Sequence, residues 1–432
     1  MSPPSTDARP EASAGSIGFP DDVSTRASTF GRGGGWLLLA ALIAAFNLRL
    51  GIAAPGPVID TIRADTGMSS GLAGVLITIP FVCMSVFAFA GPPLIRRSSP
   101  YRVILLSLVL IGVGTVVRAA APTPALLIAA TVPIGMGIAL TGGTLPVVVK
   151  QHFVRHSGAV TGAYVSALSL GVAAIAIAIV PLADAIGGWR PAFAISAAPA
   201  LIAIAMWVAV NHRTGAGNPQ PVVGGERLVP PAARRPGRVE LLAAASFGLQ
   251  SMCYSGLVGW VAAIYIEVGW SPGTAALTTA SLGLFVIPGS LILPSLSQGR
   301  DRRPWLAATL VVMAVGVLGV ALAPDAAAVV WLLAFGIGGG AAFALQLALP
   351  IDLRDSTDDI ARLTAWMLGL GYLLSALAPI LVGMLRDVTG DFVVPMTLLG
   401  SLALVGVLVA FRLPPPLRHP PEAAASARVP PP

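Results

Sequence analysis

Charged residues are scarce in this chain. Of its 432 residues only 10% are Asp, Glu, Lys or Arg, whereas a soluble domain carries about 25%. Hydrophobic residues make up 56%, and the mean hydropathy is +0.85. This composition excludes a large soluble enzyme and predicts a polytopic helical membrane protein.

Residues that bind metals or act as nucleophiles are also few. Cys83 and Cys253 are the two cysteines, and both lie inside apolar segments, where they predict small packing side chains. No H-E-x-x-H, P-loop or paired-cysteine motif occurs. The segment Gly67-Met68-Ser69-Ser70-Gly71 matches G-x-S-x-G, but that motif requires a strand-to-helix turn. Here a serine precedes an apolar run and predicts a helix cap. We expect no enzyme, no metal and no cofactor.

Long apolar runs are what the sequence does contain. Twelve runs are each near the length that crosses a bilayer. They cover residues 36–58, 70–94, 101–119, 125–149, 157–183, 190–210, 239–266, 273–297, 304–322, 326–350, 361–385 and 392–412. We therefore expect an all-α fold with twelve transmembrane helices.

One internal hydrophilic segment divides these runs into two sets of six, and a hydrophilic tail lies at each end of the chain. Residues 1–33 and 414–432 predict disordered tails, and residues 212–238 predict a linker between an N-terminal half, 34–211, and a C-terminal half, 239–413. The first apolar run is too long for a signal peptide, so we expect no cleavage.

Basic residues are distributed unequally between the two sides of the predicted membrane. One side holds the tails, the linker and most Arg residues, while Arg63, Arg118, Arg190 and Arg386 fall on the other. The positive-inside rule then predicts cytoplasmic termini, in a bacterial inner membrane. The basic residues flank apolar runs without interleaved aromatics, so we expect no nucleic acid partner.

The two halves repeat at an offset of 203 to 204 residues. Leu182-Ala183-Asp184 corresponds to Leu385-Arg386-Asp387, and Pro146 corresponds to Pro350. Such a repeat is typical of two parallel six-helix halves related by an axis along the membrane normal. In that architecture the substrate site lies near the midplane, between the halves.

Arg49 is the most informative single residue. It lies inside the first run, roughly 20 Å from Trp36 at the rise of a helix, and so near the centre of a hydrocarbon core about 30 Å thick. No Asp or Glu lies near the middle of any run, so water or substrate is the expected partner. The alternative is a structural arginine that bonds helix carbonyls or an acidic neighbour.

Polar residues in other runs are further candidates for substrate contacts. The offset of 203 carries Asn47 onto Gln250, and Tyr254 shares a helix face with Gln250. Tyr164 and Tyr372 are weaker candidates of the same kind. The alternative for all of them is hydrogen bonding between helices.

Charged residues near the ends of the runs suggest gating or coupling. Candidate gate residues lie in two corresponding loops, and their alternative role is to set membrane orientation. They are Arg96 and Arg97 in the first half and Asp301, Arg302 and Arg303 in the second. Asp184 and Asp387 form a symmetric pair that is available to carry a coupling proton.

Four segments resemble the cyanate-porter branch of the major facilitator superfamily, which includes cyanate and 2-nitroimidazole transporters. They are Asn47-Leu48-Arg49 with Pro55-Gly56-Pro57; Phe247-Gly248-Leu249-Gln250-Ser251 with Tyr254 and Trp260; Gly371-Tyr372-Leu373-Leu374 with Leu385-Arg386-Asp387-Val388-Thr389-Gly390; and Phe153 with Thr161-Gly162-Ala163-Tyr164. Two features depart from related families. The loop through Arg96-Arg97 lacks the usual acidic residue, and the fifth run lacks the Gly-Pro element of drug/proton antiporters.

The resemblance implies a monomeric secondary active transporter that works by alternating access. Its expected substrate is a small anionic or polar planar solute, bound at Arg49, with a co-transported proton or an exchanged anion as a further partner. The alternatives are a multidrug-type efflux pump, which would depend less on Arg49, and a non-transporting membrane receptor.

Overall fold

The computed structural model describes residues 32–153, 157–214, 235–297 and 300–416, and helices make up almost all of this part. The helices are α1 (Arg32–Ala53), η1 (Gly56–Val58), α2 (Ile59–Thr66), α3 (Ser70–Arg97), α4 (Pro100–Ala119), α5 (Pro124–His152), α6 (Ser157–Ile186), α7 (Trp189–Ile195), α8 (Ala198–Thr214), α9 (Arg238–Glu267), α10 (Pro272–Leu296), α11 (Arg303–Leu322), α12 (Ala328–Leu353), α13 (Thr357–Thr389) and α14 (Val393–Arg412). The predicted tails 1–33 and 414–432 and the predicted linker 212–238 lie largely outside these described ranges.

Twelve apolar segments of the described chain are long enough to cross a membrane, as the sequence predicts. The prediction placed the end of the first segment too early. The segment runs over Gly34–Thr66, because η1 and α2 continue it beyond the break at Pro55. The sixth segment, Trp189–His212, is also divided, into α7 and α8.

Serine side chains fix where several helices begin. The hydroxyl of Ser69 accepts a hydrogen bond from the backbone N–H of Leu72 at the start of α3. Ser99 and Ser271 cap α4 and α10 in the same way. The G-x-S-x-G match is therefore a helix cap, as expected, and not a nucleophile on a strand-to-helix turn.

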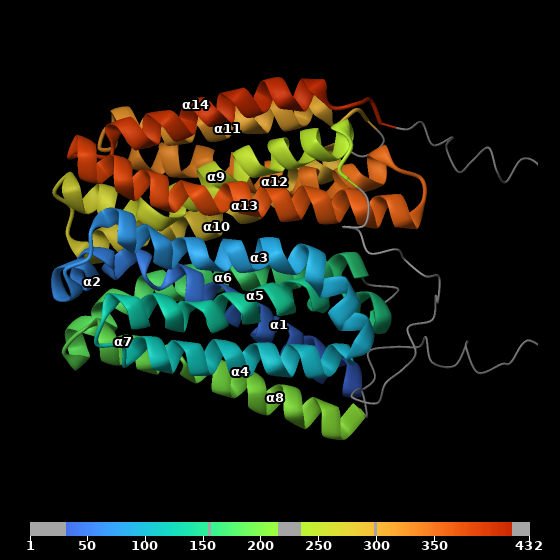
Figure 1. Cartoon of the computed structure of the whole chain (residues 1–432), viewed down its shortest axis with the longest axis horizontal. Helices are drawn as coiled ribbons and strands as arrows, with labels where there is room; N and C mark the ends of the chain where they lie inside the picture. The colour runs from blue at the N-terminus through green and yellow to red at the C-terminus, as the bar shows by residue number, and fades with distance from the viewer. Residues whose placement is uncertain (1–31, 154–156, 215–234, 298–299, 417–432) are drawn as a thin grey trace, which may run out of the picture.

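The helices form two bundles that lie side by side (Figure 1). Helices α1–α8 make up one bundle and α9–α14 the other, with α3 and α13 adjacent at the boundary. Helix α6 also packs against α10 across the boundary. We call the end where α1 begins and α14 ends the terminal end, and the end that holds α2 the far end.

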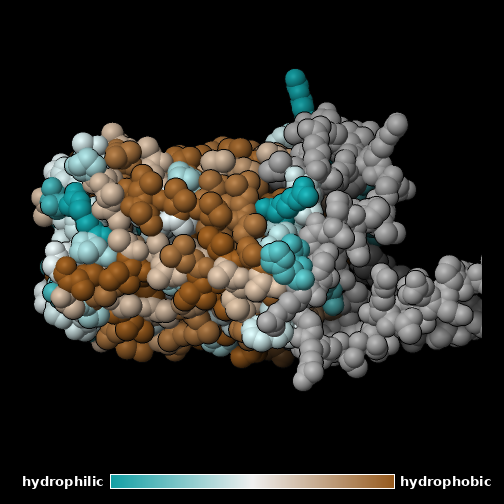
Figure 2. All heavy atoms as spheres, turned by 90° about the horizontal axis from the view of Figure 1, so that it is seen from below, coloured by the Kyte–Doolittle hydropathy of each residue, from teal (hydrophilic) through white to brown (hydrophobic). Residues whose placement is uncertain are grey.

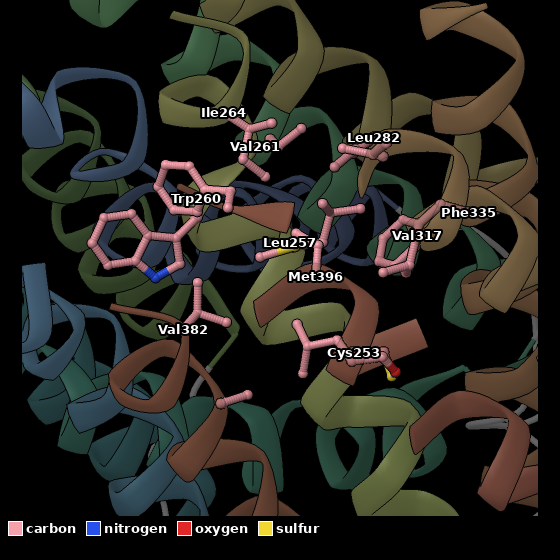
Figure 3. Close-up of a cluster of buried hydrophobic side chains, with 14 of the residues drawn as sticks. Cys253, Leu257, Trp260, Val261, Ile264, Leu282, Val317, Phe335, Val382 and Met396 are labelled. Atoms are coloured by element: carbon pink, nitrogen blue, oxygen red, sulfur yellow. The ribbon is translucent and has the colours of Figure 1, made fainter. Parts of the chain in front are cut away.

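The cores of the two bundles are made of apolar side chains drawn from many helices. In the second bundle the core includes Cys253, Leu257, Trp260, Leu282, Val317, Phe335, Val382 and Met396 (Figure 3). Ile59 and Ile77 of the first bundle belong to this same buried cluster. The apolar core is therefore continuous across the boundary between the bundles.

The outer surface carries a broad apolar belt, with hydrophilic residues gathered beside it at both ends (Figure 2). Exposed residues such as Leu201, Leu322 and Leu408 belong to this surface. Apolar residues exposed in such number suit hydrocarbon and not water.

Close packing joins α3 and α13 along their length. A Cβ added at Gly74 would lie 2.4 Å from the carbonyl oxygen of Pro379, and one at Gly383 would lie 2.3 Å from that of Ser70. At positions nearer the terminal end, the hydroxyl of Ser85 donates to the carbonyl of Gly369 at 2.7 Å. Glycine is required at these points because the two backbones touch.

Candidate functional site

Arg49 lies close to the middle of the first membrane segment, as predicted. It is the sixteenth of the 33 residues of Gly34–Thr66. Its neighbours Leu48 and Leu50 are buried, whereas Arg49 itself is partly exposed. Within the described part of the chain it forms no ion pair or hydrogen bond. The structure thus places a cation without a described partner at the middle of this segment.

The position of Arg49 is set by the packing of α1 against α6. A Cβ added at Gly171 of α6 would lie 2.4 Å from the carbonyl oxygen of Phe46 and 3.5 Å from the Cβ of Arg49. Arg49 therefore lies where the backbones of α1 and α6 come closest, and α6 also packs against α10 of the other bundle.

Tyr372 is held at the boundary between the bundles by rings from both of them. It packs edge-on against Phe247 of its own bundle, with ring centroids 5.1 Å apart. It also lies 6.4 Å from the ring of Phe81 on α3. Tyr372, one of the six predicted substrate contacts, therefore lies at the boundary between the halves. A substrate contact by Tyr372 stays a prediction.

The two predicted amides are engaged inside their own bundles. Asn47 donates to the carbonyls of Ile43, at 2.8 Å, and Pro199, at 3.1 Å. Gln250 donates to the carbonyl of Gly339 at 3.3 Å and accepts from the hydroxyl of Ser251. Each amide is 1% exposed. This geometry is that of hydrogen bonding between helices, the alternative weighed above, and a substrate contact by either amide stays a prediction.

The remaining two tyrosines lie in different surroundings. Tyr254 is partly exposed and stacks on Phe335, with centroids 6.0 Å apart and an interplanar angle of 14°. Tyr164 packs against an apolar cluster of the first bundle that includes Val160 and Trp207. Both tyrosines are therefore partly exposed and pack against the core of their own bundle, and a substrate contact by either stays a prediction.

The predicted second-half gate is a set of ion pairs within one bundle. Arg303 pairs with Asp301 at 2.7 Å and donates to the carbonyl of Leu413 at 3.2 Å. Arg302 pairs with Asp352 at 2.6 Å. These contacts link the ends of α11, α12 and α14. The side chains of Arg96 and Arg97 lie outside what the structure describes.

Asp387, one of the two predicted coupling residues, contacts the opposite bundle. Its carboxylate accepts hydrogen bonds from the backbone N–H groups of Ser70, at 3.1 Å, and Gly71, at 2.9 Å. Its counterpart Asp184 is exposed, and no described residue bonds to it. Asp387 therefore joins the halves at the far end, at the first turn of α3.

The burial of a second cation, Arg118, was not foreseen from the sequence. Arg118 is only 1% exposed, and its Nη1 donates to the carbonyl of Gly51 at 3.1 Å. Its guanidinium lies over the ring of Phe193, 4.7 Å from the centroid. The sequence placed Arg118 among charges at the outer membrane surface, because it falls at the end of an apolar run. Packing against α1 and α7 buries it instead.

Groups that would hold a metal are missing from the described ranges, in which no three His, Cys, Asp or Glu residues cluster. Cys83 and Cys253 are both buried and unoxidised. The thiol of Cys253 donates to the carbonyl of Leu399 at 3.0 Å.

Comparison with solved structures identifies the fold. A bacterial homologue of the human lysosomal transporter Spinster, in an inward-facing and occupied conformation, superposes with a TM-score of 0.70 at 16% identity, covering 89% of this chain and 97% of that one. A D-xylose-proton symporter superposes with a TM-score of 0.69 at 14% identity, covering 88% and 98%.

Comparison of sequences identifies the family. The chain is 31% identical to the cyanate transport protein CynX of Escherichia coli, over 89% of this chain and 98% of the relative. It is 31% identical to the 2-nitroimidazole transporter of the same organism, over 87% and 93%. These relatives confirm the branch that the sequence motifs resemble. The sequence model of the Major Facilitator Superfamily matches residues 38–355 and 267–431. The chain therefore belongs to the major facilitator superfamily of membrane transporters.

Proposed function

We propose that this transporter moves a small anionic or polar planar solute across the bacterial inner membrane by alternating access, with Arg49 as the cation that binds it. The observation that carries the proposal is the unpaired, partly exposed guanidinium at the middle of the first membrane segment. The proposal predicts that solute binding and transport both depend on this charge.

The free-energy cost of a charge inside the membrane favours a bound anion or water as the partner of Arg49. An arginine at the bilayer centre costs about 2.5–3.5 kcal/mol on insertion scales. Asp60 and Glu267, carboxylates at the far ends of their segments, pair with Arg63 and Arg386. A bound anion would neutralise the charge of Arg49, and water would solvate it between transport cycles.

The chemistry at the boundary suits a planar solute. A guanidinium is flat and presents paired N–H donors to a carboxylate-like or nitro-like group. The phenol of Tyr372, which lies at the boundary against Phe81 of α3, offers one further donor. The relatives named for cyanate and for 2-nitroimidazole both point to small solutes with delocalised electrons. These two compounds are therefore the first to test.

Alternating access is supported by the closure of the far end. There the chain breaks between α1 and η1, at Pro55 and Gly56, a stretch that we call the elbow of α1. Gly56 lies against the second bundle, where an added Cβ would be 3.5 Å from the carbonyl oxygen of Gly259. Ile59 is buried in the second-half core, and Asp387 bonds to α3. We infer that a solute would reach Arg49 from the terminal end, which the distribution of arginines predicts to be cytoplasmic.

The test uses purified protein in liposomes with radiolabelled cyanate and 2-nitroimidazole. Arg49→Ala should abolish saturable uptake of the transported compound, and Arg49→Lys should restore it only in part, because a lysine cannot present the paired donors. Arg63→Ala is the matched control, since Arg63 belongs to the same segment but pairs with Asp60. Normal uptake by Arg49→Ala would refute the assignment. Saturable uptake of a broad range of aromatic drugs, unchanged in Arg49→Ala, would favour the alternative of a multidrug-type efflux pump.

A further inference from the structure

Pro55 deprives a buried carbonyl of its helical hydrogen bond. In an α-helix the carbonyl of residue 51 accepts from the N–H of residue 55, and proline has no N–H. The break lies inside the membrane segment Gly34–Thr66, and Gly51 is buried. Water is absent from hydrocarbon, so the carbonyl of Gly51 needs a donor from elsewhere in the protein.

Arg118 of α4 supplies that donor, through Nη1 at 3.1 Å. The rest of its guanidinium is not used for hydrogen bonding. Nε and Nη2 are buried and have no partner in the described structure. A fully buried cation is thus directed at one carbonyl of the broken helix.

Two helix ends and one ring make this burial tolerable. Among the described ion pairs none includes Arg118. Arg118 belongs to the last turn of α4, and Gly51 lies in the last turn of α1, which ends at Ala53. Both helix ends carry partial negative charge. The ring of Phe193 adds a cation–π contact on the face of the guanidinium. The charge is therefore stabilised by α1, α4 and α7 together.

The second bundle meets the same need with a neutral group. Pro379 lies inside α13 and leaves the carbonyl of Ser375 without its helical donor. The hydroxyl of Ser255 donates to that carbonyl at 2.9 Å. A hydroxyl is thus enough to satisfy such a carbonyl. In both bundles the donor comes from a neighbouring helix, Ser255 of α9 for α13 and Arg118 of α4 for α1. The donor at Gly51 differs in that it is a fully buried, charged side chain.

We propose that Arg118 is a positioning residue of the transport site, which acts by capping Gly51 at the elbow of α1. Gly51 lies two residues beyond Arg49, so the cap fixes the stretch of α1 that carries the proposed binding cation. The cap also fixes the start of the elbow, in which Gly56 packs against Gly259 of the second bundle. The effect on transport rests on the proposed function, whereas the cap itself does not.

A double-mutant cycle on the unfolding of the purified protein tests the cap. Pro55 has φ −66° and ψ −36°, so an alanine there can keep the same backbone and supply the missing N–H. Arg118→Met should lower the melting temperature clearly in the Pro55 protein and much less after Pro55→Ala. Equal losses in the two backgrounds would overturn the proposal, because Arg118 would then act independently of the carbonyl of Gly51.

Transport gives the second readout. With radiolabelled cyanate or 2-nitroimidazole, whichever is carried, Arg118→Met should reduce uptake per folded molecule about tenfold, the factor for one lost charge-assisted hydrogen bond. Arg118→Lys and the double variant with Pro55→Ala should recover most of it. Arg190→Met is the matched control, since Arg190 also covers a ring, that of Trp189, but pairs with Asp65.

The two readouts separate the two proposals. Wild-type uptake by Arg118→Met, or a loss that neither Lys nor Pro55→Ala relieves, would overturn the positioning role. If the native protein carries neither compound, the proposed substrate is wrong, and the melting-temperature cycle still decides whether Arg118 caps Gly51.

Discussion

The carboxylate of Asp387 in the second bundle accepts a hydrogen bond of 2.9 Å from the backbone N–H of Gly71 in the first. The repeat relates Asp387 to Asp184, yet the two bundles differ here. The offset carries Gly71 onto Thr274 of α10, whose N–H donates to the hydroxyl of Ser271. Asp184 is left exposed. The contact across the boundary is therefore formed on one side of the molecule only.

Asp387→Ala should destabilise the closed far end. The change removes the acceptor for two N–H groups at the start of α3, and a lost helix cap costs about 1 kcal/mol. We expect a lower melting temperature in detergent. Asp184→Ala is the matched control, and it should leave the melting temperature unchanged.

The same two positions test proton coupling, with asparagine in place of alanine. If either carboxylate carries the coupling proton, Asp184→Asn or Asp387→Asn should abolish uptake driven by a pH gradient while leaving exchange intact. Full pH-driven uptake by both variants would exclude them and leave facilitated diffusion or anion exchange.

Tyr372→Phe should weaken transport with little effect on stability. The ring contacts with Phe247 and Phe81 remain, so the free energy of unfolding should change by no more than about 0.5 kcal/mol. If the hydroxyl contacts the solute, as proposed, its loss should raise KM for the transported solute about tenfold, as expected for one hydrogen bond to a charged solute. Tyr265→Phe is the control, because its hydroxyl bonds to Pro324 and not to the boundary. An unchanged KM in Tyr372→Phe would remove the hydroxyl from the site.

Gly171→Ala should displace the part of α1 that carries Arg49. The added Cβ would lie 2.4 Å from the carbonyl oxygen of Phe46, so the helices must separate, at a cost of about 1–3 kcal/mol. We expect a lower melting temperature and reduced uptake. At Gly142 an added Cβ meets nothing within 4 Å. Gly142→Ala should therefore stabilise α5 by up to about 1 kcal/mol. Equal responses at the two sites would contradict close packing of α1 on α6.

The pair of Asp301 and Arg303 predicts a loss of stability in acid. Hydrogen bonds from Arg303 hold the pKa of the Asp301 carboxyl below its ordinary value. The stability it contributes is present above the unfolded-state pKa and is lost as the pH falls through the folded-state pKa. Melting temperatures measured from neutral to acidic pH should fall less in Asp301→Asn than in the native protein. Parallel curves for the two proteins would contradict this coupling.

The position of a residue along its membrane segment could be predicted from the sequence, because it follows from counting residues along the apolar run. Arg49 lies at mid-segment for that reason. The direction in which each side chain points could not be predicted from the sequence, because it depends on how the bundles pack. Asn47 and Gln250 have corresponding positions in the repeat, yet each amide bonds a carbonyl of its own bundle.

The burial of Arg118 depends on a feature of the first apolar run and on tertiary packing. The position of Arg118 near the end of an apolar run suggested a surface charge. However, Pro55 in the first run already implied a carbonyl at Gly51 that lacks a donor. Which helix would provide the donor depends on tertiary contacts between α1 and α4, and no residue count reveals these.

The glycine contacts between α3 and α13 limit how the two bundles can move relative to each other. At Gly74 and Gly383 the backbones meet without intervening side chains. Sliding one helix along the other would drive larger residues into these points, so translation along the boundary is blocked. Rotation of one bundle about the line of contact keeps both glycines in place. The contact between α3 and α13 therefore permits rotation of one bundle against the other while it blocks sliding.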